Sequence, residues 1–192
     1  KGTPIEEVAG VMADLIREGK IRAWGISMCD EETLRKASAV CPVSAVQNLY
    51  NMMDTHDEAL FPALKELGVT YVSCCPLSKG LLSGAYNAQS TFEQTDFRSR
   101  MPQFTPEGYE RTAPLLKAIH SLALEKGATN AQIALAYMMN QEIPIVPIPG
   151  SKRADRIREN AGAGDISLTN EEIARLNRVL EQMGMRKGGI EQ

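Results

Sequence analysis

The chain has 192 residues, of which 43% are hydrophobic and 23% charged, and its formal net charge is −3. These values are typical of a globular domain and exclude disordered, collagen-like and disulfide-stapled chains. The acidic balance argues against a nucleic-acid partner. With no apolar run near the roughly 18 residues of a membrane span and no signal peptide, we expect a cytoplasmic protein without a membrane partner.

Several helix starts are legible in the sequence. Pro4 suits a first helical position, and Gly19 is expected to close the first helix. Residues 131–139 are apolar on nearly every side, which predicts a deeply buried helix. Pro114 is expected to break or restart the helix around it. The S/T-x-x-E/Q pattern of a capping box occurs at Thr3–Glu6, Thr55–Glu58, Thr129–Gln132 and Thr169–Glu172.

Short apolar runs lie between these helices. Each is partly β-branched and bounded by turn residues, which predicts strands. Their continuous hydrophobicity predicts parallel strands covered on both faces. Strands that alternate with helices predict an α/β fold with a parallel sheet. The runs are Ile21–Ser27, Val43–Gln47, Val69–Cys75 and Ile143–Ile148.

Only four strands fit the chain, whereas a closed (β/α)8 barrel has eight strands and typically about 250 residues. The first helix also has no strand before it. We therefore expect one incomplete unit over residues 1–185. A long loop at about 78–106 is expected to be a functional lid or disordered, and the Gly-rich tail, 186–192, is expected to be flexible.

Neither the cysteines nor the histidines predict a metal site. Cys29, Cys41, Cys74 and Cys75 lack zinc-ligand spacing, and adjacent cysteines are poorly placed for an ordinary disulfide. We expect reduced, mostly buried thiols and no metal. His56 is expected to be an exposed residue at a helix start, and no catalytic constellation is found.

The last strand leads into the segment with the most specific chemistry. Gly150 and Ser151 precede a helix that is expected to begin near Lys152, and a helix N-terminus favours anions. Lys152, Arg153 and Arg156 oppose the helix dipole there, a cost that a bound phosphate would offset. A solvated basic face is the alternative.

Two other strand ends carry polar groups. The amides of Gln47 and Asn48 can donate and accept together, as a nicotinamide carboxamide requires, although loop amides often serve structure alone. Residues 78–80, Ser-Lys-Gly, offer backbone N–H groups and one charge to a pyrophosphate. Alone, this second motif is weak.

Taken together, six segments resemble the aldo-keto reductase superfamily, in particular its bacterial-type NADPH-dependent enzymes. The similarity covers nearly the whole chain. Its segments are residues 19–27, 46–51, 75–84, 96–99, 148–153 and 156–160.

This resemblance implies the second half, strands 5–8, of a (β/α)8 barrel that reduces carbonyls with NADP(H). Ser27 and Gln47 would hold the nicotinamide carboxamide. The other cofactor contacts that it implies are Leu77, Lys79 and Gly80 along the pyrophosphate; Gly150, Ser151, Lys152 and Arg156 at the 2′-phosphate; and Glu159 and Asn160 at the adenine.

The sequence departs from the family at three points. Met28 stands where Asn is common, and Cys74 where an aromatic ring usually stacks on the nicotinamide. The catalytic Asp, Tyr, Lys and His of the family lie in the first half of the barrel and map to no residue here. We therefore expect no catalytic residue in this chain and no turnover by the chain alone.

Three functions remain open at this point. The first is an oxidoreductase that transfers hydride between nicotinamide and an aldehyde, ketone or alcohol, with a small carbonyl compound as substrate. The second is a non-catalytic, regulatory NADPH-binding module. The third is a half-barrel that associates with a second copy or with a missing N-terminal half, because open sheet edges favour association.

Overall fold

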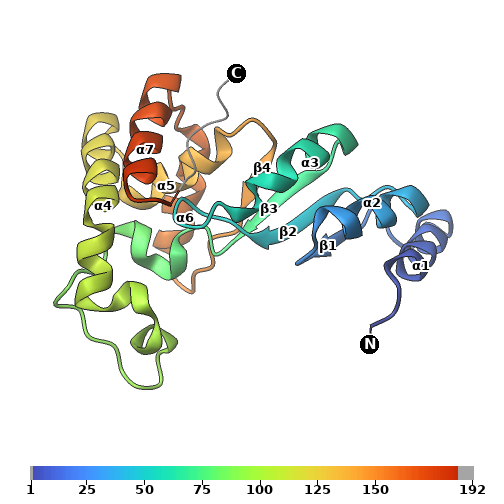
Figure 1. Cartoon of the computed structure of the whole chain (residues 1–192), viewed down its shortest axis with the longest axis horizontal. Coiled ribbons are helices and arrows are strands. Elements are labelled where there is room, and N and C mark those ends of the chain that lie inside the picture. The colour runs from blue at the N-terminus through green and yellow to red at the C-terminus, as the bar shows by residue number, and fades with distance from the viewer. Residues whose placement is uncertain (1, 186–192) are drawn as a thin grey trace.

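The structure is a computed structural model that describes residues 2–185. Its elements follow one another in the expected order (Figure 1). The flexible tail expected at 186–192 lies outside the described residues. The elements are α1 (Ile5–Arg17), β1 (Gly25–Ser27), α2 (Glu31–Val40), β2 (Ala45–Leu49), α3 (Phe61–Leu67), β3 (Thr70–Cys74), α4 (Pro106–Lys126), α5 (Asn130–Met139), β4 (Ile145–Pro147), α6 (Ala154–Ala161) and α7 (Asn170–Gln182).

The four strands form one parallel sheet in the order β1-β2-β3-β4. Parallel strands joined in sequence by right-handed crossovers place their connecting helices on the same face of the sheet. A doubly wound sheet instead reverses its strand order and covers both faces. The observed order is therefore that of a barrel segment, and the α/β prediction is confirmed.

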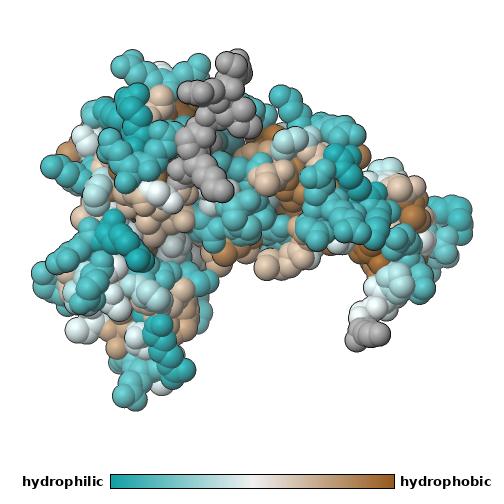
Figure 2. Space-filling model, viewed as in Figure 1, coloured by the Kyte–Doolittle hydropathy of each residue, from teal (hydrophilic) through white to brown (hydrophobic). Residues whose placement is uncertain are grey.

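The helices cover one face of this sheet, so the expectation of two covered faces is wrong. In β2, Val46 and Asn48 are buried, whereas Gln47 between them is exposed. In the view of Figure 1, α2 and α3 lie above the strands and no ribbon of residues 2–185 lies beneath them. Hydrophobic side chains reach the surface in the part of the molecule that contains these strands and helices (Figure 2). Apolar residues on both faces of the strands explain why hydrophobicity is continuous along these sequence segments.

The core is thickest around α5, which packs against β4, α4 and α6. Seven of its ten residues are buried, as the sequence predicts. Tyr137 lies in this core and donates to Asn177 of α7 over 2.5 Å. Within residues 2–185, every helix is too short or too polar to cross a membrane.

Two of the predicted capping boxes are confirmed and two are wrong. Thr129 and Thr169 each accept from the N3 backbone and are capped in return by Gln132 and Glu172. Helix α1 instead follows Pro4 without a side-chain cap, so Thr3 plays no such role. The Thr55 hydroxyl is also not a cap, because it donates to the distant carbonyl of Met185.

The break expected at Pro114 is also wrong, because α4 runs unbroken from Pro106 to Lys126. Pro114 lies on the exposed side of this helix, where water can satisfy the carbonyl that loses its N–H partner. Leu115 and Ile119 on the opposite side are fully buried and hold the helix in the core.

The long loop at 78–106 has a small core of its own and is not disordered. It contains three short 3₁₀ turns, at Ser78–Ser83, Phe97–Arg100 and Pro102–Phe104. Phe104 packs edge-on against the rings of Tyr86 and Phe92. This aromatic cluster lets a segment without regular helices keep one shape beside the sheet.

Candidate functional site

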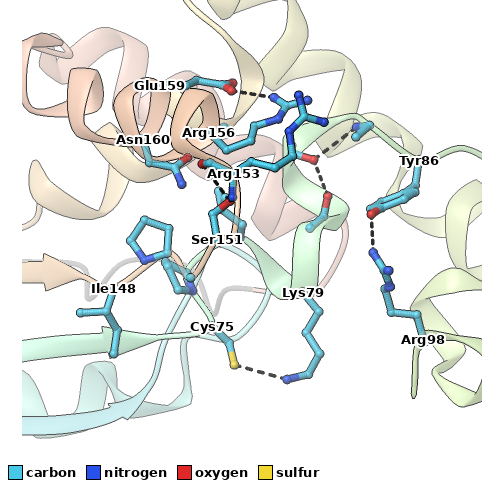
Figure 3. Close-up of a pocket in the computed structure, with 18 of the residues that line it drawn as sticks. Cys75, Lys79, Tyr86, Arg98, Ile148, Ser151, Arg153, Arg156, Glu159 and Asn160 are labelled. Carbon is cyan, nitrogen blue, oxygen red and sulfur yellow. Dashed lines mark hydrogen bonds and ion pairs between the residues drawn. The ribbon is translucent and has the colours of Figure 1, made fainter. Parts of the chain in front are cut away.

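A cavity of about 670 Å³ lies at the carboxyl ends of β3 and β4. Its walls come from the turn after β3, the long loop and the start of α6, which converge in Figure 3. This volume is within the range of small-molecule and cofactor sites. The position is where ligands bind in parallel α/β proteins.

Eight of the eleven residues predicted to contact a cofactor line this cavity. They are Leu77, Lys79, Gly80, Gly150, Ser151, Arg156, Glu159 and Asn160. Ser27, Gln47 and Lys152 do not line it, although Lys152 directly follows a lining residue. The structure thus brings together the residues predicted to contact the pyrophosphate, the 2′-phosphate and the adenine. Ser27 and Gln47, which were predicted to bind the carboxamide, lie outside the cavity.

Ser27 and Gln47 lie beside each other on the open face of the sheet. They are register partners in β1 and β2, and the Ser27 hydroxyl donates to the Gln47 carbonyl over 3.0 Å. Both residues are exposed. Their side chains can therefore meet a ligand that extends from the cavity across the strand ends.

Asn48 has a structural role and is not free to bind a ligand. Its side-chain oxygen accepts from the backbone N–H of Cys29 at 3.1 Å, and its amide nitrogen donates to the Cys29 carbonyl at 2.9 Å. The residue is 5% exposed. Of the two amides weighed from the sequence, only Gln47 faces the open side.

The turn after β3 brings backbone and charge into the cavity. Ser78, Lys79 and Gly80 all have positive φ angles, 46°, 58° and 99°. Left-handed backbone is costly for the first two residues, and such strain tends to occur at functional sites. The Lys79 ammonium lies 3.3 Å from the Cys75 sulfur and 5.6 Å from the Phe97 ring centre.

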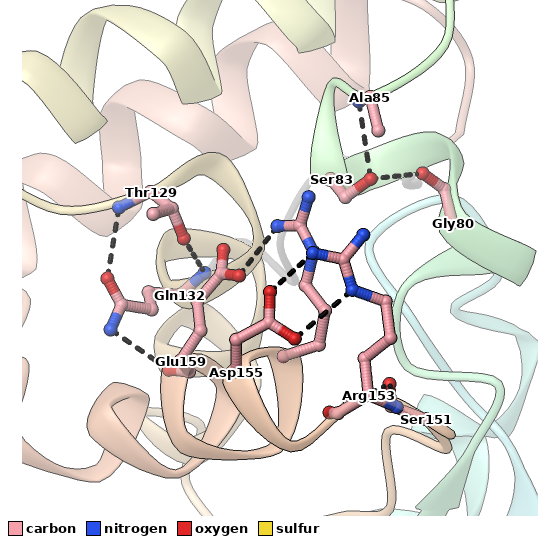
Figure 4. Close-up of polar contacts among 10 residues, drawn as sticks. Gly80, Ser83, Ala85, Thr129, Gln132, Ser151, Arg153, Asp155 and Glu159 are labelled. Atoms are coloured by element: carbon pink, nitrogen blue, oxygen red, sulfur yellow. Dashed lines mark hydrogen bonds and ion pairs between the residues drawn. The ribbon is translucent and has the colours of Figure 1, made fainter.

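Helix α6 begins in front of the cavity without a side-chain cap. Its N-cap residue is Arg153, and the Ser151 hydroxyl accepts from the Arg153 N–H at 3.1 Å in a preceding turn (Figure 4). Ser151 therefore does not cap the helix. The backbone N–H groups at this helix start suit an anion.

Two of the three cations at the start of α6 are paired with carboxylates. Arg153 contacts Asp155 at 2.5 Å, and Arg156 contacts Glu159 at 2.6 Å. The bond from Arg153 lowers the pKa of Asp155 to about 2. Nearby carboxylates therefore already offset part of the cost that these two arginines carry at the helix start.

The cavity nevertheless carries an excess of positive charge. Its lining contains one carboxylate, Glu159, and four basic groups, of which Lys79 and Arg98 lie outside α6. The other two are Arg153 and Arg156. Because a phosphate oxygen can replace a carboxylate as partner of an arginine, this lining fits an anionic ligand.

The predicted site left out five residues of the long loop that line the cavity, which are Ser83, Ala85, Tyr86, Phe97 and Arg98. The guanidinium carbon of Arg98 lies 4.8 and 4.7 Å from the ring centres of Tyr86 and Phe92, which are themselves 5.2 Å apart, so Arg98 packs against both rings. It also forms an ion pair with Asp96 at 2.5 Å. Tyr86, Phe97 and Arg98 border the cavity (Figure 3). For Phe97 and Arg98 the segment at 96–99 was the available signal, because it belongs to the family resemblance, whereas Tyr86 lies outside the resembling segments.

His56 lies apart from the cavity, between two carboxylates. Its Nδ1 is 2.5 Å from Asp54 and its Nε2 is 2.9 Å from Asp57. The hydrogen bond to Asp54 raises its pKa. Its side chain is 63% exposed, which agrees with the sequence expectation.

The buried groups beside His56 are structural. Tyr71 is fully buried, and its hydroxyl donates to Asp57 at 2.7 Å. Burial, followed by this bond, raises the pKa of Tyr71 far above its ordinary value. No group of metal-ligating side chains gathers anywhere in residues 2–185.

Comparison with known proteins gives one family. The sequence profile of the Aldo/keto reductase family matches residues 1–181. The chain is 37% identical over 184 residues to aldo-keto reductase str7 of Strobilurus tenacellus, covering 94% of this chain and 55% of that protein. It is 35% identical over 175 residues to aldo-keto reductase yakc [NADP(+)] of Schizosaccharomyces pombe, covering 89% and 52%. The chain thus spans about half the length of these curated relatives.

Solved structures show the same fold. Glycerol dehydrogenase AKR11B4 from Gluconobacter oxydans superposes with a TM-score of 0.89 at 24% identity, covering 99% of this chain and 59% of that one. An aldo/keto reductase from Klebsiella pneumoniae, solved with NADP and acetate, gives a TM-score of 0.68 at 25% identity, covering 93% and 55%.

Proposed function

Because the chain belongs to the aldo/keto reductase family, we propose that it binds NADP(H) for hydride transfer between the nicotinamide and an aldehyde, ketone or alcohol. The observation that carries this proposal is the cationic cavity at the carboxyl ends of β3 and β4, directly before the start of α6. One relative, yakc [NADP(+)], has NADP in its name, and the Klebsiella pneumoniae structure is a complex with NADP. Both support the choice of cofactor.

The proposal assigns this chain to the second half of the barrel, strands 5–8. Four parallel strands in sequential order and a length near half that of the relatives support this assignment. The catalytic Asp, Tyr, Lys and His of this family, of which the Tyr donates the proton, would then belong to the other half. Carbonyl reduction by a whole enzyme, made of both halves, is therefore also proposed.

The residues present fit an elongated anionic cofactor, which supplies the hydride when it is bound. Lys79 and the backbone of Gly80, with Leu77 alongside, would hold the pyrophosphate. Ser151 and Arg156 would bind the 2′-phosphate once Arg156 exchanges its Glu159 partner, with Gly150 and Lys152 beside them. Glu159 and Asn160 would then face the adenine.

The nicotinamide end would lie over the open face of the sheet. Ser27 and Gln47 are exposed there and would bind its carboxamide. Cys74 ends β3 on the same side as Val72 and leaves no ring for the nicotinamide to stack on. These groups bind and orient the cofactor, and we assign a proton-transfer step to none of them.

The open face of the sheet supports a second part of the proposal. Val146 in the edge strand β4 is 50% exposed and shares its register row with Val72. The other barrel half would cover this face, and a second copy is the alternative partner. Light scattering distinguishes them, because self-association predicts a mass near twice 21.0 kDa for the chain alone.

A binding titration tests the cofactor proposal. We expect NADPH, followed by its own fluorescence, to bind more tightly than NADH. Arg156→Met should remove most of this preference, about tenfold for one charge-assisted hydrogen bond. Trp24 is a poor reporter because it precedes β1, at the end of the sheet away from the cavity.

Arg158→Met is the matched control, because Arg158 lies on the same helix, is exposed and does not line the cavity. It should leave both affinities unchanged. No binding at millimolar NADPH would contradict the proposal, as would an equal loss with both variants. The chain alone should not consume NADPH with a reactive aldehyde, and steady consumption would contradict the assignment of the catalytic residues to the other half.

A further inference from the structure

Two adjacent cysteines end β3 at the wall of the cavity. Cys74 is the last residue of the strand, and Cys75 lines the cavity (Figure 3). Both are half-buried and free. Cys75 has a φ of 53°, so the chain turns sharply between the two side chains. An extended backbone would instead point successive side chains to opposite faces.

The two thiols form one group with Lys79. Cys74 and Cys75 are neighbours along the chain, and burial, followed by the charge of Cys75, raises the pKa of Cys74. The Lys79 ammonium donates to the Cys75 sulfur from 3.3 Å. Cys75 is thus joined to the Lys79 ammonium by this contact and to Cys74 along the chain.

Two common uses of paired thiols do not fit this group. A zinc site needs further His, Cys, Asp or Glu ligands, and no such group of ligands occurs in the described part of the chain. An ordinary disulfide spans Cα atoms about 4.4–6.8 Å apart, whereas neighbours across a trans peptide are about 3.8 Å apart. A thiophilic atom inserted between the sulfurs avoids this restriction.

We propose that Cys74 and Cys75 form a dithiol site that captures monosubstituted trivalent arsenicals, R–As(OH)₂, at the wall of the cavity. Two As–S bonds form and two As–O bonds break. The two thiol protons leave with the two hydroxides as water. Arsenic stays trivalent and both sulfurs keep their oxidation state, so the capture needs no oxidant or reductant.

The other two cysteines lack these properties. Cys29 and Cys41 are 8% and 4% exposed. Burial and the carboxylates of Asp30 and Asp57 raise the pKa of Cys29 to about 11. Cys74 and Cys75 therefore differ from Cys29 and Cys41 in being half-buried and in being neighbours.

Capture would obstruct the cavity. The arsenic and its organic group would occupy space beside Leu77, Lys79 and Gly80, where the proposed function places the cofactor pyrophosphate. This consequence rests on the proposed function, whereas capture itself does not. The two are therefore measured separately.

Intact-mass spectrometry of the full 192-residue chain with equimolar phenylarsine oxide tests capture. We expect one adduct and the loss of two of four titratable thiols. The adduct should survive excess monothiol and be removed by a dithiol, because only a dithiol replaces both As–S bonds. Cys74→Ser and Cys75→Ser should each raise the arsenical concentration for half-capture at least tenfold.

Cys29→Ala is the matched control and should capture like the unmodified chain, with circular dichroism confirming that each variant is folded. Capture that persists in the Cys74→Ser and Cys75→Ser variants, or the absence of any adduct, overturns the dithiol site. In a second titration, the adduct should weaken NADPH binding at least tenfold. Undiminished NADPH binding by the adduct overturns the obstruction. An untreated chain that binds no NADPH contradicts the proposed function instead and leaves the capture result standing.

Discussion

The side chain of Gln132 joins the start of α5 to the end of α6. Its amide oxygen accepts from the backbone N–H of Thr129 at 3.0 Å, and its amide nitrogen donates to the backbone carbonyl of Glu159 at 2.9 Å (Figure 4). One capping residue therefore also positions the helix whose start faces the cavity. Replacing this side chain tests the two bonds separately.

Gln132→Ala should lower the free energy of unfolding by about 1–2 kcal/mol, because a cap and a bond between helices are both lost. Gln132→Glu keeps the capping acceptor but loses the donor to Glu159. It should cost less than Ala, and urea unfolding measures both variants. If Gln132→Glu lowered the free energy of unfolding more than Gln132→Ala does, the capping bond of this side chain would not stabilise the fold.

Two glycines should respond in opposite directions to alanine. A Cβ on Gly25 would lie 2.7 Å from the Ala45 carbonyl oxygen, so β1 must shift against β2. We expect Gly25→Ala to destabilise the chain by about 1–3 kcal/mol. A Cβ on Gly10, inside α1, meets no atom within 4 Å, and Gly10→Ala should stabilise by about 0.5–1 kcal/mol. Thermal unfolding checks the pair, and a stable Gly25→Ala variant would refute the close strand approach.

The contacts of Arg98 with the rings of Tyr86 and Phe92 should keep the long loop ordered. Arg98→Lys keeps the charge but loses the planar group that stacks and bonds Asp96 at the same time. We expect the loop to be cleaved about threefold to tenfold faster by thermolysin, a loss of about 0.6–1.4 kcal/mol in local stability. Arg100→Lys, at an exposed position of the same turn, is the control. Equal cleavage rates in all three proteins would disprove the role of Arg98.

His56 should make stability depend on pH near neutrality. Because Asp54 raises its pKa above 6.5 in the folded state, protonated His56 stabilises the fold fully below the unfolded pKa of about 6.5. That contribution is lost as the pH rises through the raised folded pKa. For a side chain that is 63% exposed, we expect only a few tenths of a kcal/mol.

Asp54→Asn should reduce this part of the stability change between pH 6 and pH 8.5, measured by urea unfolding at each pH. Asp57 still faces the ring at 2.9 Å, so a smaller dependence should remain. His56→Gln should abolish it. An unchanged pH profile in His56→Gln would show that another group titrates in this range.

Local patterns in the sequence determined the order of elements. The capping residues Thr129 and Thr169 act within one helical turn, and the apolar run of α5 reflects burial on every side. Such interactions join residues that are near in sequence, so a pattern reveals them directly. The chemistry of the strand ends already pointed to Lys79, Gly80, Gly150, Ser151 and Arg156, and the family resemblance added Leu77, Glu159 and Asn160.

The tertiary structure alone decided which of these groups are available. It paired Arg156 with Glu159, turned Asn48 toward the backbone of Cys29 and brought the Cys75 sulfur to Lys79. It also left one face of the sheet uncovered and kept α4 continuous through Pro114. Composition and periodicity record how well a side chain suits burial. Its partner depends on rotamers and on contacts between segments, which exist only once the strands and helices have packed.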